Sequence, residues 1–99
     1  MITQIRSLAI APGKGGDAIA FAQTMAKLVK EKYGKAAEIV MPIGGNPARI
    51  AFRISFESMA EWETLTAKLL ADPEIQKTIA AGSVNFLPGS AHDDFWRTI

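Results

Sequence analysis

The chain has 99 residues, enough for one domain with its own hydrophobic core and no more. Apolar residues make up 48% and charged residues 21%, and the net charge is +1. This balance gives no support for nucleic-acid binding, which usually needs a concentrated basic surface. Cysteine is absent and His92 is the single histidine, which excludes disulfides, thiolate metal sites, a cysteine nucleophile and any site with two imidazoles.

The sequence shows no sign of membrane insertion or export. No apolar run approaches the roughly 20 residues that span a bilayer. A strand-like pattern begins at Ile2, which leaves no room for a signal or transit peptide. We therefore expect a soluble, cytoplasmic protein that forms a single domain over residues 1–99.

The first half of the chain predicts a strand, a helix and a second strand. Residues 2–11 are rich in Ile, Leu and Ala and end at a Pro-Gly pair. Asp17 is the expected N-cap of the helix and Gly34 its stop. Residues 37–43 form the second predicted strand. The helix is predicted from apolar residues at spacings of three and four, namely Ala18, Phe21, Ala22, Met25, Leu28, Val29 and Tyr33.

A Gly-Gly-Asn-Pro turn at residues 44–47 predicts a hairpin into a third strand over residues 48–56. Ser58 and Glu61 then match a capping box and predict a helix from residue 59 onward. The third strand has the clearest alternation in the chain, with Ile50, Phe52, Ile54 and Phe56 on the side expected to face the helices.

The last third of the chain predicts a short helix, a strand and a tail. Asp72 precedes a proline, which is tolerated at the first helical position, so Asp72 is expected to cap a second helix through Ala80. Residues 83–87 are the predicted fourth strand. The tail of residues 90–99 carries Trp96 and is expected to pack on a second subunit or, alternatively, to cover the mouth of a barrel.

The resulting order, βαββαβ, is that of a ferredoxin-like α+β fold: a four-stranded antiparallel sheet with both helices on one face. The uncovered face is mixed, and an apolar patch on such a face usually marks an interface. We expect two copies to pack these faces together as a homodimer that encloses a space between the sheets, although a monomer with a solvated sheet is the alternative. The residues predicted on the uncovered face are Gln4, Arg6, Leu8, Ile10, Ala51, Arg53 and Ser55.

Two stretches resemble the NIPSNAP-like proteins. Residues 2–14 are similar to that family's opening strand, whose pattern is roughly E-L-R-x-Y-x-L-x-P-G-K, with Gln4 in place of the acid and Leu8 in place of the tyrosine. Residues 56–60 and 71–74 are similar to its third strand and bipartite second helix. The positions that match the opening pattern are Arg6, Pro12, Gly13 and Lys14.

The resemblance implies a dimeric α/β barrel, of the superfamily that includes antibiotic-biosynthesis monooxygenases and chlorite-dismutase-like proteins. Members range from cofactor-free oxygenases through haem enzymes to proteins of unknown role. The resemblance therefore implies a fold and an assembly rather than a chemistry.

The glycine-rich run from Gly13 to Ala18 fits the G-x-G-x-x-A pattern of dinucleotide-binding loops, and Glu38 lies about twenty residues on, where a ribose-binding acid is expected. We favour a flexible turn between strand and helix, because Glu38 falls at the start of its strand and the chain is too short for a doubly wound sheet. No residue is a recognisable haem ligand. We expect no cofactor.

Arg6 and Arg53 are the leading candidates for a ligand site, with Gln4 and Ser55 beside them. If the first and third strands are neighbours, both arginines project from the uncovered face. A buried arginine needs a partner. A glutamate such as Glu38 or the other subunit would make it a structural ion pair, whereas an anionic or carbonyl compound would make it a ligand contact.

His92 is the only side chain whose ordinary pKa lies near neutrality. In an extended segment it shares a face with Asp94 but not with Asp93. A His–Asp base or metal site is one interpretation, and a solvated turn is the other. We include His92 among the candidate ligand-binding residues and expect no metal.

Two classes of function remain. The first is a small-molecule-binding protein of unassigned role, with its ligand between the sheets of the dimer. The second is a cofactor-independent monooxygenase or isomerase acting on a polyketide- or quinol-like compound. Such an enzyme needs a proton acceptor in its cavity. The sequence places no His, Cys or buried acid there, which favours the binding protein.

Overall fold

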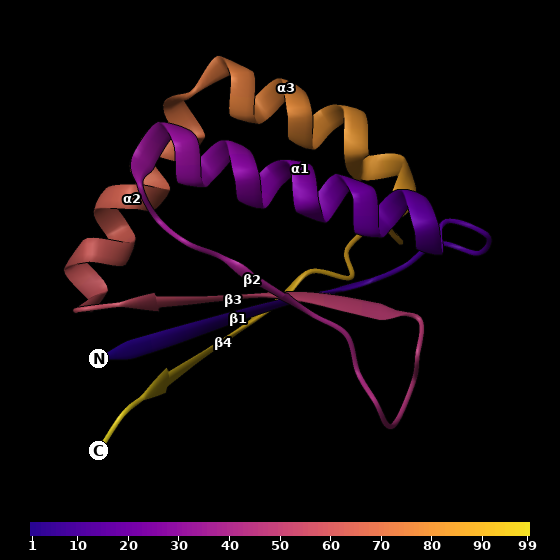
Figure 1. The fold of residues 1–99 in the computed structure, drawn as a ribbon, viewed down its shortest axis with the longest axis horizontal. Coiled ribbons are helices and arrows are strands. Elements are labelled where there is room, and N and C mark those ends of the chain that lie inside the picture. The colour runs from indigo at the N-terminus through magenta and orange to yellow at the C-terminus, as the bar shows by residue number, and fades with distance from the viewer.

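The computed structural model describes residues 1–99 as one four-stranded sheet with helices along one side (Figure 1). All strand pairs are antiparallel, in the order β2-β3-β1-β4. This confirms the predicted ferredoxin-like α+β fold. None of the helices is both long and apolar enough to cross a membrane. The elements are β1 (Ile2–Ala9), α1 (Gly15–Tyr33), β2 (Glu38–Val40), β3 (Arg49–Phe56), α2 (Met59–Ala71), α3 (Pro73–Gly82), a 3-10 turn η1 (Ser83–Asn85) and β4 (His92–Arg97).

Three predicted helix boundaries are confirmed by their caps. Gly34 ends α1 in the left-handed conformation, with φ at +70°, which glycine adopts at little cost. The Ser58 hydroxyl accepts a hydrogen bond of 3.2 Å from the backbone N–H of Glu61 at the start of α2. The Asp72 carboxylate accepts from the backbone N–H of Ile75, also at 3.2 Å, and so separates α2 from α3.

Two boundaries differ from the prediction. The expected cap at Asp17 is wrong, because α1 already begins at Gly15 and Asp17 lies in its first turn. An acidic side chain there still stabilises the positive end of the helix dipole. The second strand is shorter than predicted, since only Glu38–Val40 of residues 37–43 pair with β3.

The predicted fourth strand over residues 83–87 is also wrong. Its first three residues form η1, and only Phe86 bridges to Ile10. The true fourth strand is β4, which pairs with β1 from His92 to Arg97. The tail is therefore an edge strand of the sheet rather than a separate segment.

The core lies between α1 and the sheet. Ile50 has no exposed surface and packs with Ala18 and Ala22 of α1. Small residues at these two helix positions let the helix approach the strands closely. Gly82 likewise allows α3 to approach α1 closely, because a Cβ atom there would lie only 2.1 Å from Cδ1 of the Phe21 ring.

The register of β1 against β3 corrects the predicted faces. Arg6 lies directly opposite Phe52 and Gln4 opposite Ile54. Directly paired residues share a face of the sheet. The prediction that Gln4 and Arg6 share a face with Arg53 is therefore wrong, because they lie on the side of the helices. Leu8 and Ile10, also predicted on the uncovered face, pack in the core.

We call the side under the helices the helix-covered face and the other side the open face. In Figure 1 all three helices lie above the sheet, whereas the loop between β2 and β3 and the end of β4 extend below it. The open face is made of Thr3, Ile5, Ser7 and Ala9 of β1, Arg49, Ala51, Arg53 and Ser55 of β3, Glu38 and Val40 of β2, and His92, Asp94 and Trp96 of β4.

Candidate functional site

Three polar side chains meet on the helix-covered face, where most neighbours are apolar. Arg6 donates from Nε to one carboxylate oxygen of Asp93 at 2.8 Å and from Nη2 to the other at 2.7 Å. Gln4 adds a bond of 3.3 Å from its amide nitrogen to Asp93. Strand pairing produces this arrangement, because Arg6 lies directly opposite Asp93 in the β1–β4 ladder.

The cluster is partly open to solvent. Gln4 is only 6% exposed, whereas the Arg6 side chain is 50% exposed and that of Asp93 28%. Within the protein, the Nη1 group of Arg6 has no acceptor and the side-chain oxygen of Gln4 has no donor. A donor and an acceptor are thus available to a bound molecule at one place.

The charges of the pair reinforce each other. The hydrogen bonds from Arg6 hold the pKa of Asp93 below its usual range, against the opposing effect of burial. The bond to Asp93 likewise raises the pKa of Arg6. Asp93 is therefore a firmly ionised hydrogen-bond acceptor at neutral pH and a weak base.

An aromatic pair borders the cluster. Phe95 lies directly opposite Gln4 and two residues from Asp93 on the same side of β4. Its ring meets the indole of Trp62 from α2 edge to face, with centroids 5.1 Å apart. The Trp62 side chain is itself only half-buried. The cluster therefore combines planar apolar surface with directed polar groups, as small-molecule sites commonly do.

The other candidate residues lie on the open face. Arg53 contacts Glu38 at 3.3 Å, the glutamate named in the predicted ion pair. His92 contacts Asp94 at 3.2 Å and not Asp93, as the strand geometry predicts. Ser55 is exposed on the same face, two residues along β3 from Arg53, and pairs with Thr3. The sheet therefore separates the five candidate residues into two groups.

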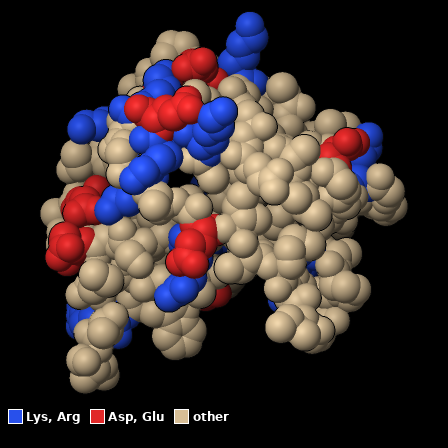
Figure 2. Space-filling view, in the orientation of Figure 1, with Lys and Arg blue, Asp and Glu red and all other residues tan.

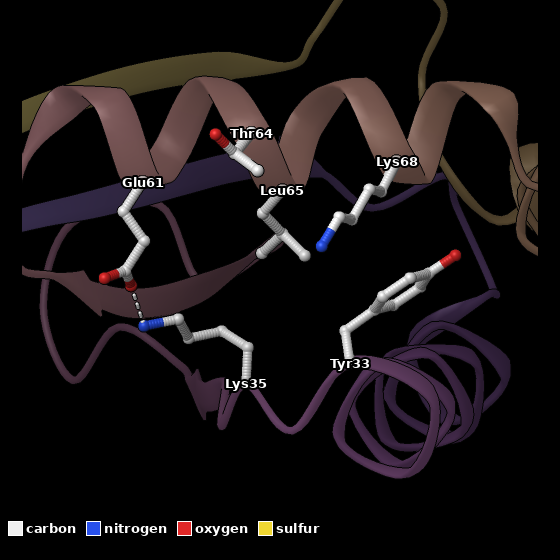
Figure 3. Close-up of a pocket in the computed structure, with 6 residues that line it drawn as sticks. All are labelled: Tyr33, Lys35, Glu61, Thr64, Leu65 and Lys68. Atoms are coloured by element: carbon white, nitrogen blue, oxygen red, sulfur yellow. Dashed lines mark hydrogen bonds and ion pairs between the residues drawn. The ribbon is translucent and has the colours of Figure 1, made fainter.

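A pocket of about 320 Å³ opens between the end of α1 and α2 (Figure 3). The Lys35 ammonium crosses it to pair with Glu61 and also donates to the Ser55 carbonyl at 2.9 Å. Lys68 points into the pocket beside the Tyr33 ring. None of the predicted ligand-binding residues lines it. The lining consists of Tyr33, Lys35, Glu61, Thr64, Leu65 and Lys68.

Charged side chains gather above this pocket, at the upper left of Figure 2, where α1 and α2 end and α3 begins. Lys32 bridges Asp72 at 2.7 Å and Glu74 at 2.8 Å there, and the Tyr33 hydroxyl donates to Asp72. These contacts tie the helices together. Glu38, the acid that a dinucleotide fingerprint would use, is engaged by Arg53 on the open face. No three or more His, Asp or Glu side chains form a group that would hold a metal ion.

No protein-family model and no curated protein matches the sequence. Solved structures do match. An uncharacterized NIPSNAP domain protein from Burkholderia xenovorans superposes with a TM-score of 0.85 at 16% identity, covering 100% of this chain and 95% of that one. A NIPSNAP family protein from Agrobacterium tumefaciens gives 0.83 at 16% identity, with 99% and 92% covered. This chain therefore has the same fold as these two structures.

Other solved structures share this fold. A putative antibiotic biosynthesis monooxygenase from Deinococcus radiodurans matches with a TM-score of 0.71 at 12% identity, covering 99% of this chain and 92% of that one. The resemblance predicted from residues 2–14 is thus confirmed at the level of the fold. Identities this low establish architecture and leave function to be argued from the site.

Asp93 and Phe95 were not predicted from the sequence as members of the cluster around Arg6. Both were placed in the tail because residues 83–87 were taken for the last strand. Alternation of apolar and polar residues gives no signal here, because each side of residues 92–97 carries one aromatic residue and two polar or charged ones. The register that places Asp93 opposite Arg6 is visible only in the folded sheet.

Proposed function

We propose that the protein binds a small planar molecule at the cluster of Gln4, Arg6 and Asp93. One observation supports this most directly: beside two aromatic rings, the cluster presents the Nη1 group of Arg6 without an acceptor and the side-chain oxygen of the buried Gln4 without a donor. A purely structural ion pair needs neither the spare donor nor the spare acceptor. The proposal places the ligand between sheet and helices rather than between two sheets.

The donors and acceptors define the class of ligand. Arg6 Nη1 would donate to a carbonyl oxygen, whereas Asp93 would accept from a hydroxyl group. A second carboxylate would be repelled by Asp93, which lies within 2.8 Å of the guanidinium. A hydroxylated aromatic carbonyl or quinol-like compound satisfies both groups, and Trp62 and Phe95 offer surface for its ring.

Binding is favoured over catalysis because of the state of Asp93. A general base works best when its pKa lies near the operating pH. The pKa of Asp93 is lowered, principally by its hydrogen bond with Arg6, so it is a poor acceptor for a phenolic proton. His92, the other candidate base, lies on the opposite face of the sheet.

Titration calorimetry with 2-hydroxyacetophenone and 1,4-naphthohydroquinone tests the proposal, with acetophenone as the probe that lacks the hydroxyl. Arg6→Lys keeps the charge but loses the planar fork, and should weaken binding about tenfold. Arg53→Lys, on the open face, is the matched control and should leave binding unchanged. Equal effects of the two substitutions, or no binding of either hydroxylated probe by the wild type, would count against the site.

A cofactor-independent monooxygenase is the second candidate. Its support is the likeness of the fold to structures described as antibiotic biosynthesis monooxygenases. Oxygen uptake with 1,4-naphthohydroquinone, compared with its autoxidation in buffer, separates the two candidates. Uptake that depends on the wild-type protein and falls in Asp93→Asn would favour the enzyme.

We also propose that the single domain of residues 1–99 works in the cytoplasm as a homodimer paired through the open face. Supporting the dimer, large apolar side chains are exposed there or in the adjoining loop: Trp96 at 64%, Met41 at 44% and Val40 at 38%. Sedimentation equilibrium at micromolar concentration should give twice the monomer mass. Cell fractionation tests the compartment.

A further inference from the structure

The open face has a hollow at one corner. It has a volume of about 170 Å³ and lies where β2 and β3 approach the loop that joins them. Ser7 and Ala51 are direct neighbours in the sheet and form the floor of the hollow, which is deep because their side chains are small. Val40, Met41, Pro42 and Arg49 form the walls.

A large exposed aromatic side chain lies at the opposite corner of the same face. Trp96 is near the end of β4, the edge strand farthest from β2, and is 64% exposed. It pairs with Thr3 near the start of β1, whereas the hollow lies beside Ser7 farther along that strand. Trp96 and the hollow are therefore separated both across the strands and along them.

Figure 1 shows the same arrangement from the side. The loop between β2 and β3 extends below the sheet at the right, and the end of β4 extends below it at the left. In Figure 2 the lower edge of the molecule is notched between these two projections, and the loop is uncharged from Met41 to Ala48. The open face is thus bounded at one end by β4, which carries Trp96, and at the other end by the loop between β2 and β3, which lines the hollow.

A two-fold axis parallel to the sheet makes these corners complementary. Rotation about an axis perpendicular to the line joining them places each corner of one copy over the opposite corner of the other. In such an isologous interface both contacts form at once, because residue i meets residue j and j meets i. Cavities of about 150 Å³ accommodate benzene, so the hollow can receive most of an indole ring.

The charges of the open face suit burial against a second copy. Arg53 is neutralised by Glu38 at 3.3 Å and His92 contacts Asp94 at 3.2 Å. Arg49 has no carboxylate partner, and its Nε donates only to the Asn46 carbonyl, at 3.0 Å. A guanidinium at the wall of the hollow is a favourable neighbour for an inserted indole, through cation–π attraction.

The strands supply about half of the area that a standard dimer interface needs. The four strands have 8, 3, 8 and 6 residues, and at about 3.3 Å per residue and 4.8 Å between strands they cover roughly 400 Å² in projection. A standard interface buries roughly 800 Å² per partner. In the proposed dimer, side chains and the loop between β2 and β3, which extends below the sheet, supply the rest.

We propose that the Trp96 indole of each copy inserts into the hollow formed by Ser7, Val40, Met41, Pro42, Arg49 and Ala51 of the other copy. This inference rests on the homodimer of the proposed function and specifies how its two halves fit together. A buried aromatic anchor in a complementary hollow is the typical position of an interface hot spot.

Sedimentation equilibrium on three variants tests the contact. Trp96→Ala removes the inserted ring and should raise the dimer dissociation constant about 30-fold or more. Ala51→Phe fills the hollow without touching the tryptophan and should weaken the dimer comparably. Leu70→Ala, which shortens a side chain 68% exposed on α2, is the matched control and should leave the constant unchanged.

The outcomes separate this inference from the proposals on which it rests. A wild-type dimer that Trp96→Ala and Ala51→Phe both leave intact would overturn the inserted indole while keeping the dimer. A wild-type chain that is monomeric at micromolar concentration would overturn the dimer and the inference together. Neither result bears on ligand binding at Arg6, which is measured on the other face. If Trp96→Ala fails to fold by circular dichroism, Ala51→Phe decides the question alone.

Discussion

Arg6 and Arg53 occupy neighbouring strands and have equally exposed side chains, at 50% each, yet their surroundings differ. Arg6 makes two short bonds to one carboxylate, at 2.8 and 2.7 Å, on the face beneath the helices. Arg53 makes a single contact of 3.3 Å with Glu38, whose side chain is 68% exposed, on the face without helices.

The difference shows that exposure alone does not identify a site. Bidentate geometry fixes a guanidinium in one orientation, and the buried amide of Gln4 fixes the carboxylate that holds it. Arg53 has no comparable support within one copy of the chain. The helix-covered face is therefore organised within a single chain, whereas in the proposed dimer the open face gains its support from a second copy.

The tightest packing under the helices gives the largest expected effect. Gly82→Ala would place a methyl group 2.1 Å from Cδ1 of the Phe21 ring, where α3 contacts α1, and should lower the free energy of unfolding by about 3 kcal/mol. Urea denaturation measures it. Gly16→Ala, whose methyl group would enter open space in the first turn of α1, is the control and should stabilise by about 0.4–1 kcal/mol. Equal effects would mean that α1 and α3 are loosely packed.

The pH dependence of stability tests the contact of Asp72 with α1, which joins the helices above the sheet. The pKa of Asp72 is lowered, chiefly by its hydrogen bond with Lys32 and next by that with Tyr33. Stability from this carboxylate is therefore present above its unfolded pKa of about 3.9 and is lost as pH falls through the lower folded value. Asp72→Asn keeps a good N-cap but removes the charge. The variant should be less stable at pH 7, and the difference should shrink as pH approaches 2.

Urea denaturation of both proteins at pH 7, 4 and 2.5 makes that comparison. A difference in stability that stays constant across this range would show that the Asp72 carboxylate acts through its cap alone. Lys77→Met, a change on the outer side of α3, is a control that removes a charge without touching the contact between helices.

Sequence reasoning predicted the elements better than their faces. The third strand has large apolar residues on one side only. The alternation therefore predicts directly that the side carrying Ile50 faces the helices. The first strand has apolar residues on both sides, with Ile5 on the open face and Leu8 beneath the helices. A shift of one residue moves every side chain to the other face. Only the register against β3 decides between the two, and register depends on contacts far apart in the sequence.

The position of the last strand was also predicted wrongly because its residues show no clear apolar side. Residues 83–87 are more apolar than residues 92–97, but a Pro-Gly pair follows them and they form only a 3-10 turn and one bridge. In β4 all residues except Asp93 are exposed, and each side of the strand carries one aromatic residue and two polar or charged ones. An edge strand of this kind has no apolar stripe to reveal it. This error affected the prediction of the candidate site most, because Asp93 contacts Arg6 only when residues 92–97 pair with β1.

Removing Arg6, which makes two hydrogen bonds to Asp93, should have an intermediate effect on stability. Arg6→Met leaves Asp93 partly buried with only Gln4 as a side-chain partner, and should cost about 1–2 kcal/mol of stability because the guanidinium is half in solvent. The pKa of Asp93 should rise once the hydrogen bonds that lower it are lost. Urea denaturation measures the first effect and carbon-detected NMR titration the second. The double variant Arg6→Met, Asp93→Leu should regain part of the stability, and a larger loss there would contradict this account.

The smallest effect is expected at Arg53. A single contact between two half-exposed side chains contributes little, so Arg53→Met should change stability by no more than about 0.5 kcal/mol when measured below the dimer dissociation constant. Above that constant the open face is covered in the proposed dimer, and Glu38 would lose its partner in a drier setting. The loss caused by Arg53→Met should then grow with protein concentration, whereas that caused by Arg6→Met should stay the same. Denaturation at two concentrations measures both. If Arg53→Met lowers stability as much as Arg6→Met in the dilute sample, the two arginines are held equally firmly within one chain.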